Sequence, residues 1–265
     1  MEQKVKAFLF GNRLIERGQK LGIAVSGGKD SMALAHMLKD LSPVLIHIDL
    51  GIGEYSKESR RVVEEFADEH ALELVVYDLK KEWGYSIPEI ATKLGKRPCS
   101  VCGAIKRYYQ NRLAVSKGLV LATAHTLDDV ASFLVYSLTT GKPVRLDPIL
   151  PEGKGRARKI KPLFYIKEDA ILRYIQENRV PYTTTRCPFH RAPARIIREA
   201  LQEVERMRPG SMKTLVKTLL RITPREESQP RLCKYCEMPA AGNVCSICRI
   251  RLRLGLPPEA PVRVG

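Results

Sequence analysis

The chain has 265 residues, of which 44% are apolar and 28% are charged, and its 45 lysines and arginines exceed its 29 acidic residues by a formal charge of +16. This composition supplies enough apolar side chains for a buried core and excludes a wholly disordered chain. The longest apolar runs, such as Leu119 to Ala122, are far shorter than the roughly 20 residues that a membrane-spanning helix requires. The N-terminus shows no secretory signal, so we expect a cytoplasmic protein that does not cross membranes.

Short apolar runs alternate with segments of helical periodicity in the first part of the chain. The runs that we predict as strands are 21–26, 43–50, 73–78, 119–124 and 158–163. Ser56, Ser86 and Thr126 occupy positions typical of helix N-caps, and Glu89 has the spacing of a capping box with Ser86. The alternation predicts an α/β fold in which a parallel sheet of about five strands carries helices on both faces.

Helical periodicity continues after the last predicted strand, at 167–179, 194–207 and 212–221. At Thr223 the composition changes to a polar, proline-containing stretch that is typical of a linker. We therefore predict two domains, residues 1–222 and a small zinc-ribbon-like module at residues 223–265.

The positive charge is concentrated in the C-terminal part of the chain. Residues 151–265 carry 24 basic and 11 acidic side chains, against 21 and 18 in residues 1–150. Gly153 to Lys161 holds five cations and no acid, and the arginines that follow are Arg186, Arg191, Arg195 and Arg198. Such clusters favour contact with phosphates, so we expect nucleic acid on this surface, with simple solubility as the alternative explanation.

A glycine-rich loop, SGGKDS, follows the first predicted strand and leads directly into a helix. Its glycines let the backbone close around an oxyanion, while the helix N-terminus and the serine and lysine side chains supply hydrogen-bond donors. The spacing is neither that of a P-loop NTPase nor that of a Rossmann dinucleotide site. A strand followed by SGGxDS is instead typical of PP-loop ATP pyrophosphatases, which split ATP into AMP and pyrophosphate. His47 and Ile48, at the end of the second strand, would then flank the adenosine.

Four of the seven cysteines form two CxxC pairs near the C-terminus: Cys233, Cys236, Cys245 and Cys248. Four thiolates at this spacing converge tetrahedrally on zinc, and the short loop between the pairs is stable only with the metal. Two redox dithiols are the alternative, but they would not need to be doubled at this spacing. We therefore predict one structural zinc ion.

The other three cysteines are Cys99, Cys102 and Cys187. A CxxC pair alone fits a redox pair, half of a zinc site or two small buried side chains. Three thiolates suit an iron–sulfur cluster with one iron left open, which is a place to hold sulfide. A CxxC pair that carries a persulfide, with Cys187 as its resolving thiol, is the competing interpretation, and the spacing does not decide between the two.

The motifs, in their order, resemble the TtcA/TtuA family of tRNA 2-thiolation enzymes, and the TtuA branch most closely. The matching segments lie within residues 21–249 and are SGGKDS, HIDLGIGEYS, RPCSVCGAIKRYY, AHTLDD, RCP and the terminal double CxxC. The resemblance implies an ATP-dependent sulfurtransferase with Mg²⁺, a 4Fe–4S cluster, structural zinc and a tRNA substrate. In the TtuA branch it implies that the T-loop ribothymidine exchanges its C2 oxygen for sulfur, which a ubiquitin-like carrier protein delivers as a thiocarboxylate. We also expect a homodimer.

The resemblance assigns roles to individual residues. The catalytic set comprises three cluster ligands, one lysine of the catalytic pocket and two acidic residues of the ATP and magnesium site: Cys99, Cys102, Cys187, Lys106, Asp30 and Asp129. The nucleotide-binding set comprises the glycine-rich loop and residues that follow the strands: Ala24, Ser26, Gly27, Gly28, Lys29, Asp30, Ser31, His47, Ile48, Lys106, Ala124 and Asp129. In the implied mechanism, ATP adenylates the C2 oxygen, and hydrosulfide at the open iron then displaces AMP.

The sequence departs from the family pattern in two places. Residues 1–20 contain no cysteine or histidine, so we do not expect the N-terminal zinc finger that is usual in the TtuA branch. The family's GHNLDD is AHTLDD here, so Ala124 replaces a glycine that lets the backbone approach the nucleotide. The alternative functions are 2-thiolation of an anticodon-loop cytidine or wobble uridine, and a non-catalytic zinc-ribbon RNA-binding protein.

Overall fold

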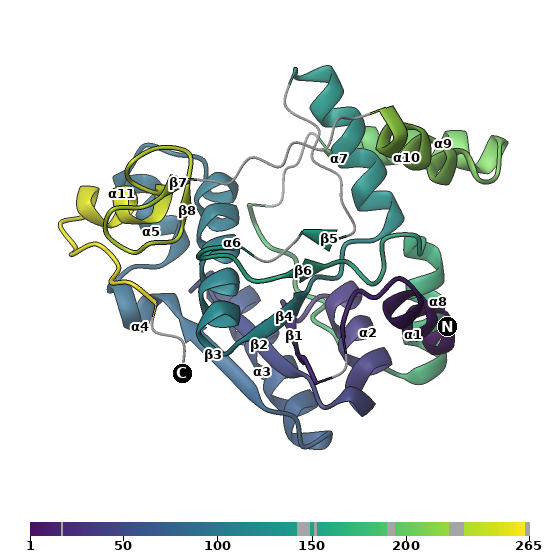
Figure 1. Ribbon diagram of the computed structural model, residues 1–265, viewed down its shortest axis with the longest axis horizontal. Helices are drawn as coiled ribbons and strands as arrows, with labels where there is room; N and C mark the ends of the chain where they lie inside the picture. Colours follow the sequence, from purple (N-terminus) through teal and green to yellow (C-terminus); the bar gives the residue numbers. More distant parts are fainter. Residues whose placement is uncertain (17, 142–148, 151–152, 190–193, 223–230, 263–265) are drawn as a thin grey trace.

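A central sheet organises the protein, which we describe from a computed structural model of residues 1–16, 18–141, 149–150, 153–189, 194–222 and 231–262 (Figure 1). Its strand order is β3-β2-β1-β4-β6-β5. The first five strands in this order are parallel and β5 is antiparallel to β6. The strands are β1 (Lys20–Val25), β2 (Val44–Asp49), β3 (Leu74–Asp78), β4 (Leu119–Ala122), β5 (Ile149–Leu150) and β6 (Lys159–Ile160).

The predicted parallel sheet is confirmed, and its first four strands lie within two residues of the predicted bounds. The fifth is shorter than predicted, because only Lys159 and Ile160 pair with β4. Pro162 has no N–H to donate to a neighbouring strand, and the chain turns there. The antiparallel strand β5 was not predicted.

Helices cover both faces of the sheet, as predicted. The first face is covered by α1 (Glu2–Gly11), α2 (Lys29–Leu38), α3 (Gly53–Glu69) and α8 (Glu168–Asn178), with the 3₁₀ helix η1 (Lys39–Leu41) after α2. The second face is covered by α4 (Leu79–Trp83), α5 (Ile87–Lys93) and α6 (Pro98–Ser116). Successive residues of β1 serve the two cores in turn, since Ile23 and Val25 pack on the first face and Ala24 on the second. A strand buried on both faces has a nearly continuous apolar sequence.

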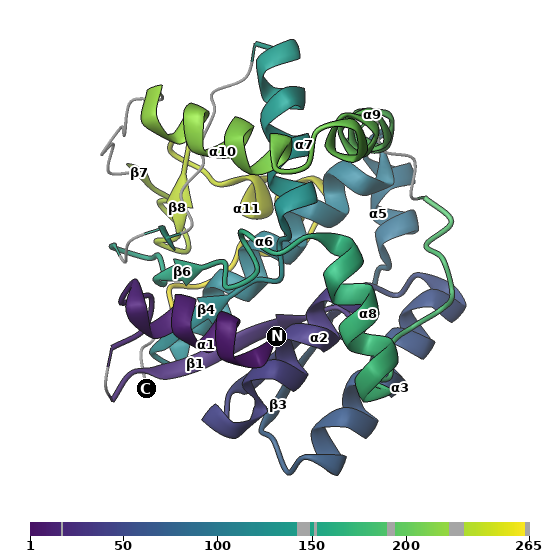
Figure 2. The same ribbon diagram turned by 90° about the vertical axis from the view of Figure 1, so that its right-hand side faces the viewer.

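Three helices form a separate group with its own apolar cluster: α7 (Leu127–Thr139), α9 (Ala194–Met207) and α10 (Ser211–Ile222). Both views show them together on one side of the sheet (Figures 1 and 2). The predicted helices at 167–179, 194–207 and 212–221 are confirmed. Among the described residues, no helix combines the length and the apolar character needed to cross a bilayer.

The predicted helix starts are confirmed at two of three positions. Ser86 and Glu89 form a capping box at the start of α5, and Thr126 caps α7 in the same way with Asp129. The prediction for Ser56 was wrong, because α3 begins at Gly53. The Ser56 hydroxyl instead accepts a hydrogen bond from the Ile52 N–H at 2.9 Å, so it satisfies a backbone donor from inside the first turn.

The C-terminal segment packs against α6 and contains β7 (Arg231–Leu232), β8 (Pro239–Ala240) and α11 (Ser246–Arg253) (Figure 1). Glu259 connects it to α6, since its carboxylate accepts a hydrogen bond from the Tyr109 hydroxyl and forms ion pairs with Arg251 at 2.9 Å and Arg112 at 3.8 Å. The predicted linker from Thr223 lies largely outside the described residues, so the domain boundary stays a prediction.

We predict that Glu259→Ala lowers the free energy of unfolding by about 1.5–3 kcal/mol, because hydrogen bonds to charged groups contribute about that much. Urea denaturation measures the change. Glu177→Ala, at an exposed position on α8, is the matched control and should have little effect. Equal stabilities of the two variants would contradict a structural role for Glu259.

Candidate active site

The site lies where the strand order reverses. From β1 the chain continues to β2 and β3 on one side, whereas β4 lies on the other side of β1. Loops at the carboxyl ends of β1 and β4 therefore diverge and leave a crevice between them, which is where open α/β sheets bind ligands. The SGGKDS loop follows β1 and the AHTLDD segment follows β4, so the fold brings both motifs to this crevice.

Internal hydrogen bonds close the SGGKDS loop. The Ser31 hydroxyl donates to the Gly28 carbonyl at 2.8 Å and accepts from the Ser26 N–H at 3.1 Å. Helix α2 starts immediately after Gly28, and no side chain of the described residues caps its N-terminus. The first N–H groups of an uncapped helix attract anions, so the loop and α2 can together hold phosphate.

The two glycines of the loop have different roles. Gly27 has a φ of +75°, and a Cβ added there would lie 2.8 Å from the backbone of Ser59 in α3. Gly28 has a φ of −76°, and an added Cβ would meet only the Ser26 hydroxyl, at 3.4 Å. Only Gly27 is therefore required by both conformation and space.

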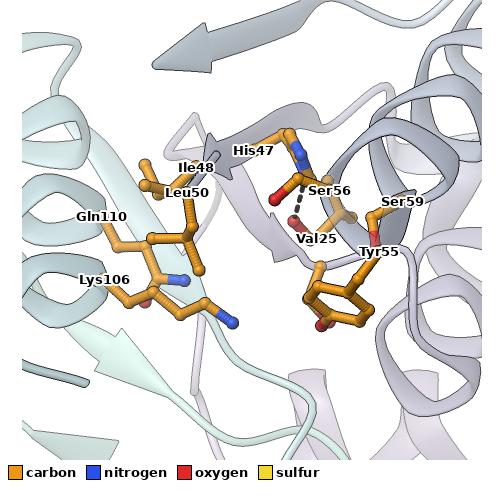
Figure 3. A pocket seen from close by; sticks show the side chains of 10 residues that line it. Val25, His47, Ile48, Leu50, Tyr55, Ser56, Ser59, Lys106 and Gln110 are labelled. Carbon is orange, nitrogen blue, oxygen red and sulfur yellow. Dashed lines mark hydrogen bonds between the residues drawn. The ribbon is translucent and has the colours of Figure 1, made fainter. Parts of the chain in front are cut away.

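A pocket beside the loop brings together four of the predicted site residues: Ser26, His47, Ile48 and Lys106. Lys106 extends into it from α6, facing His47 of β2 and Tyr55 of α3 (Figure 3). Gln110 also lines it, one helical turn after Lys106. Its remaining lining residues are Val25, Leu50, Tyr55, Ser56 and Ser59.

His47 presents an unused hydrogen-bonding atom in this pocket. Its Nδ1 lies 3.0 Å from the Val25 carbonyl, and its Nε2 is buried without a partner in the described part of the chain. Burial lowers the pKa of His47, so the ring is neutral at pH 7. A carbonyl can only accept, so Nδ1 carries the proton and Nε2 is an acceptor. The pocket therefore suits a ligand that donates a hydrogen bond, such as a ribose hydroxyl or an amino group.

A network of five charged side chains lies between the loop, α7, α8 and α9. The Lys29 ammonium contacts Asp30 at 2.9 Å and Glu168 at 2.5 Å. Arg198 pairs with Glu168 at 2.9 Å and also with Asp129. Burial raises the pKa of Asp30, and the charges of Asp129 and Glu168 raise it further, whereas Lys29 opposes the shift. The three carboxylates offer oxygen ligands of the kind that Mg²⁺ prefers, and in this structure they pair with Lys29 and Arg198.

Arg198 corrects one sequence prediction. We expected it among exposed arginines that contact nucleic acid, but its guanidinium is held by Asp129 and Glu168 within the site. Arg186 is exposed, as that prediction requires. Arg191 and the side chain of Arg195 lie outside the described residues.

The structure brings Cys99, Cys102 and Cys187 to one place. Cys99 and Cys102 lie in the first turns of α6, and the Cys99 thiol donates to the carbonyl of Phe189, two residues beyond Cys187, at 2.9 Å. Burial raises the pKa of Cys102, Lys106 opposes the shift, and the charges of Cys187 and Cys99 add to it. The three thiols are thus neighbours of one another and of Lys106.

The segment before Cys187 is hydrogen-bonded to the SGGKDS loop and to α3. The Thr183 N–H donates to the Gly27 carbonyl at 2.8 Å. Both oxygens of Glu58 in α3 accept backbone hydrogen bonds at 3.0 Å, one from Thr184 and one from Thr185. Hydrogen bonds from Thr185 and Thr184 lower the pKa of Glu58 to about 2, so it is ionised at neutral pH. The phosphate loop and the third cysteine are therefore connected through one short segment.

The four C-terminal thiols form a compact, buried group: the ligand atoms of Cys233, Cys236, Cys245 and Cys248 all lie within 4.8 Å of one another. Hydrogen bonding with Cys245 lowers the pKa of Cys236 to about 4, and the same interaction raises the pKa of Cys245. One thiol of the pair thus ionises at the expense of the other. Four thiolates at this distance need a divalent cation, so the donor set fits zinc.

The remaining predicted residues lie beside the crevice. Ala24 is buried in β1, and Ala124 follows β4 and packs against the apolar core. Sequence reasoning missed Glu168, Glu58, Ser59 and Gln110. Gln110 could have been predicted, because it lies four residues after the predicted site residue Lys106 and residues four apart share a helix face. Glu58 and Glu168 belong to ordinary charged helix segments, so only the fold reveals their partners.

We predict that Gly27→Ala abolishes ATP binding and lowers the midpoint of thermal unfolding. A left-handed conformation costs a non-glycine residue about 1–2 kcal/mol, and the backbone of Ser59 blocks the added methyl group. Gly28→Ala is the matched control for folding and should leave the midpoint close to that of the wild type. Equal midpoints for the two variants would show that the Gly27 contact is unimportant.

Comparisons with known proteins identify the family of the chain. Residues 1–201 match the PP-loop domain family. A tRNA-5-methyluridine(54) 2-sulfurtransferase of Thermus thermophilus is 41% identical over 90% of this chain and 78% of that protein. A protein of the same name from Pyrococcus horikoshii is 33% identical over 94% of this chain and 83% of that protein.

A solved structure also resembles this fold. The U34-tRNA thiolase NcsA of Methanococcus maripaludis, determined with its 4Fe–4S cluster, has a TM-score of 0.81 and 26% identity, covering 98% of this chain and 88% of that one. The chain therefore belongs to the PP-loop family that includes these sulfurtransferases, as its motifs predicted.

Proposed function

We propose that the protein is an ATP-dependent tRNA sulfurtransferase that replaces the C2 oxygen of the T-loop 5-methyluridine by sulfur. One observation carries the proposal: Lys106, whose charge acts on Cys102, lines one pocket with Ser26 of the phosphate loop, and the segment that holds Cys187 is hydrogen-bonded to Gly27 of that loop. Two relatives, which this chain covers over 78% and 83% of their length, carry this activity in their names and support the choice of nucleoside. ATP activation and sulfur transfer can then take place in one crevice.

The chemistry requires activation because a carbonyl oxygen is a poor leaving group. The C2 oxygen attacks the α-phosphate of ATP, pyrophosphate leaves, and a sulfur nucleophile then attacks C2 and expels AMP. The residues Ser26 to Ser31 and the N-terminus of α2 hold the phosphates. His47 Nε2 accepts a hydrogen bond from the adenosine of ATP, and Ala24, Ile48 and Ala124 lie beside that adenosine.

The acidic side chains of the site have a second role. Asp30 and Asp129, together with Glu168, would hold Mg²⁺, which neutralises phosphate charge. Oxygen ligands of this kind are those that Mg²⁺ prefers. Lys106 faces the pocket and stabilises the charge of the phosphates or transfers a proton near C2.

Cys99, Cys102 and Cys187 would hold a 4Fe–4S cluster. Cys102 is influenced electrostatically by both Cys99 and Cys187, which supports a shared ligand group. With three protein ligands, such a cluster leaves one iron free to carry the sulfur that is transferred. The four C-terminal cysteines would hold zinc, which fixes the C-terminal module on α6.

The proposed function also implies binding partners. The tRNA backbone lies along the basic C-terminal part, where Arg186 is exposed. A ubiquitin-like carrier protein with a C-terminal thiocarboxylate supplies the sulfur. We further propose a cytoplasmic homodimer with the zinc-binding module at residues 223–265.

Thiolation of the wobble uridine is a second candidate, because the NcsA structure is a U34-tRNA thiolase with the same overall fold. Mass analysis of tRNA nucleosides from a deletion strain separates the two. We predict that 2-thioribothymidine disappears and that 2-thiocytidine and wobble 2-thiouridine remain. Loss of the wobble nucleoside alone would replace the first candidate by the second, and no change in any thionucleoside would contradict both.

We predict that Cys187→Ala abolishes thiolation but leaves ATP binding intact, because Cys187 would be a cluster ligand, whereas the residues Ser26 to Ser31 hold the ATP phosphates. Iron, sulfide and zinc should be measured after anaerobic purification. The wild type should contain about four irons and one zinc per chain, and the variant should lose iron but keep zinc. Thiolation that survives without iron would exclude the cluster and favour a persulfide on Cys99 or Cys102.

A further inference from the structure

A group of cations lies on the α6 side of the sheet edge, apart from the phosphate loop. In the parallel ladder Lys159 of β6 pairs with Leu121 of β4, and Leu121 belongs to the core under α6. Paired residues of neighbouring strands point to the same face, so Lys159 faces α6 as well. Arg107 comes from α6 itself, and the charges of Arg107 and of Lys161, which follows β6, both act on Lys159.

The contact between β6 and α6 is fixed by one side chain. Asn111, one helical turn after Arg107, donates to the Gly155 carbonyl at 2.9 Å and accepts from the Ala157 N–H at 3.1 Å. These bonds hold the segment before Lys159 against the helix. The backbone before Lys159 is therefore held beside the part of α6 that carries Arg107.

Lys159 and Arg107 differ from the paired cations elsewhere in the described part of the chain. Arg158, which precedes Lys159 and points to the other face, pairs with Glu16 at 3.0 Å. Within the described ranges, neither Lys159 nor Arg107 forms an ion pair with a carboxylate. Burial lowers the pKa of Lys159 to about 8, and the charges of Lys161 and Arg107 contribute in the same direction. An anion bound here would relieve this repulsion.

The group lies next to the cysteines. The charge of Arg107 acts on Cys102, and the adjacent residue Lys106 lines the pocket beside the phosphate loop. The ATP phosphates already have a separate cradle at Ser26 to Ser31. A phosphate held by Lys159 and Arg107 would therefore come from the molecule that enters on the cysteine side of the crevice.

We infer that Lys159 and Arg107, assisted by Lys161, bind one backbone phosphate of the tRNA next to the nucleotide that is modified. The inference rests on the proposed function, since it assigns the phosphate to a tRNA. A single phosphate clamped beside Cys102 fixes the position of the target base relative to the sulfur without reading the sequence.

The test compares Lys159→Met with the wild type in binding a tRNA transcript at several salt concentrations. Methionine keeps the aliphatic stem and removes the charge, so the fold should be retained. Each phosphate contact contributes about one to the slope of log affinity against log salt concentration. We expect Lys159→Met to lower this slope by about one, Lys159→Arg to restore it, and the affinity for ATP alone to be unchanged.

Lys57→Met is the matched control, because Lys57 is an exposed lysine on α3 that pairs with Glu54, and it should leave the slope unchanged. Arg107→Gln, at an exposed position, provides the same test if Lys159→Met does not fold. An unchanged slope in the folded variant would overturn the inference. A loss of ATP affinity with an unchanged slope would assign the site to a nucleotide phosphate instead. Binding slopes do not depend on turnover, so failure of thiolation in the wild type would be a separate result.

Discussion

The close approach of Gly27 to Ser59 is the constraint on which the rest of the site depends. An added methyl group would lie 2.8 Å from the Ser59 backbone, so the phosphate loop and α3 can pack in this way only around a glycine. The same loop accepts the Thr183 N–H at its Gly27 carbonyl, and Glu58, next to Ser59, accepts the backbone of Thr184 and Thr185. The position of the cysteine segment is thus set by the same contact that shapes the anion cradle.

Helix α6 combines several functions because its faces and ends meet different partners. Its first turns carry Cys99 and Cys102, and its middle presents Lys106 to the pocket. Its later turns hold the C-terminal segment, since the Tyr109 hydroxyl donates a hydrogen bond to Glu259 and Arg112 donates one to the Ala260 carbonyl at 2.7 Å. A metal that orders the four C-terminal thiols would therefore stabilise the helix that positions the cysteine group and Lys106.

The sheet and the phosphate loop could be predicted from the sequence because both depend on local patterns. Buried parallel strands are apolar runs, and an anion-binding turn needs glycines at fixed spacing. The ion-pair network could not be predicted in this way, since Glu168 lies more than 130 residues from Lys29 and its helix pattern is ordinary. The prediction for Ser56 was wrong for a related reason. A serine in the first turn can accept a hydrogen bond from the Ile52 N–H, and its residue type does not reveal which N–H it satisfies. The family resemblance supplied Lys106, whose role no local pattern indicates.

The excess of positive charge does not by itself locate an RNA surface, because the cations of the C-terminal part have different environments. Arg158 is neutralised by Glu16, and Arg198 by Asp129 and Glu168, so neither can contact phosphate without breaking an ion pair. Lys159 has no such partner among the residues that the structure describes, and the charges of Lys161 and Arg107 act on it. An anion that binds a half-buried cation without a partner replaces repulsion between neighbouring cations by attraction. An anion that binds a paired cation must first separate two charges. Lys159 and the neighbouring Arg107 are for this reason a better guide to where a phosphate binds than the number of basic residues.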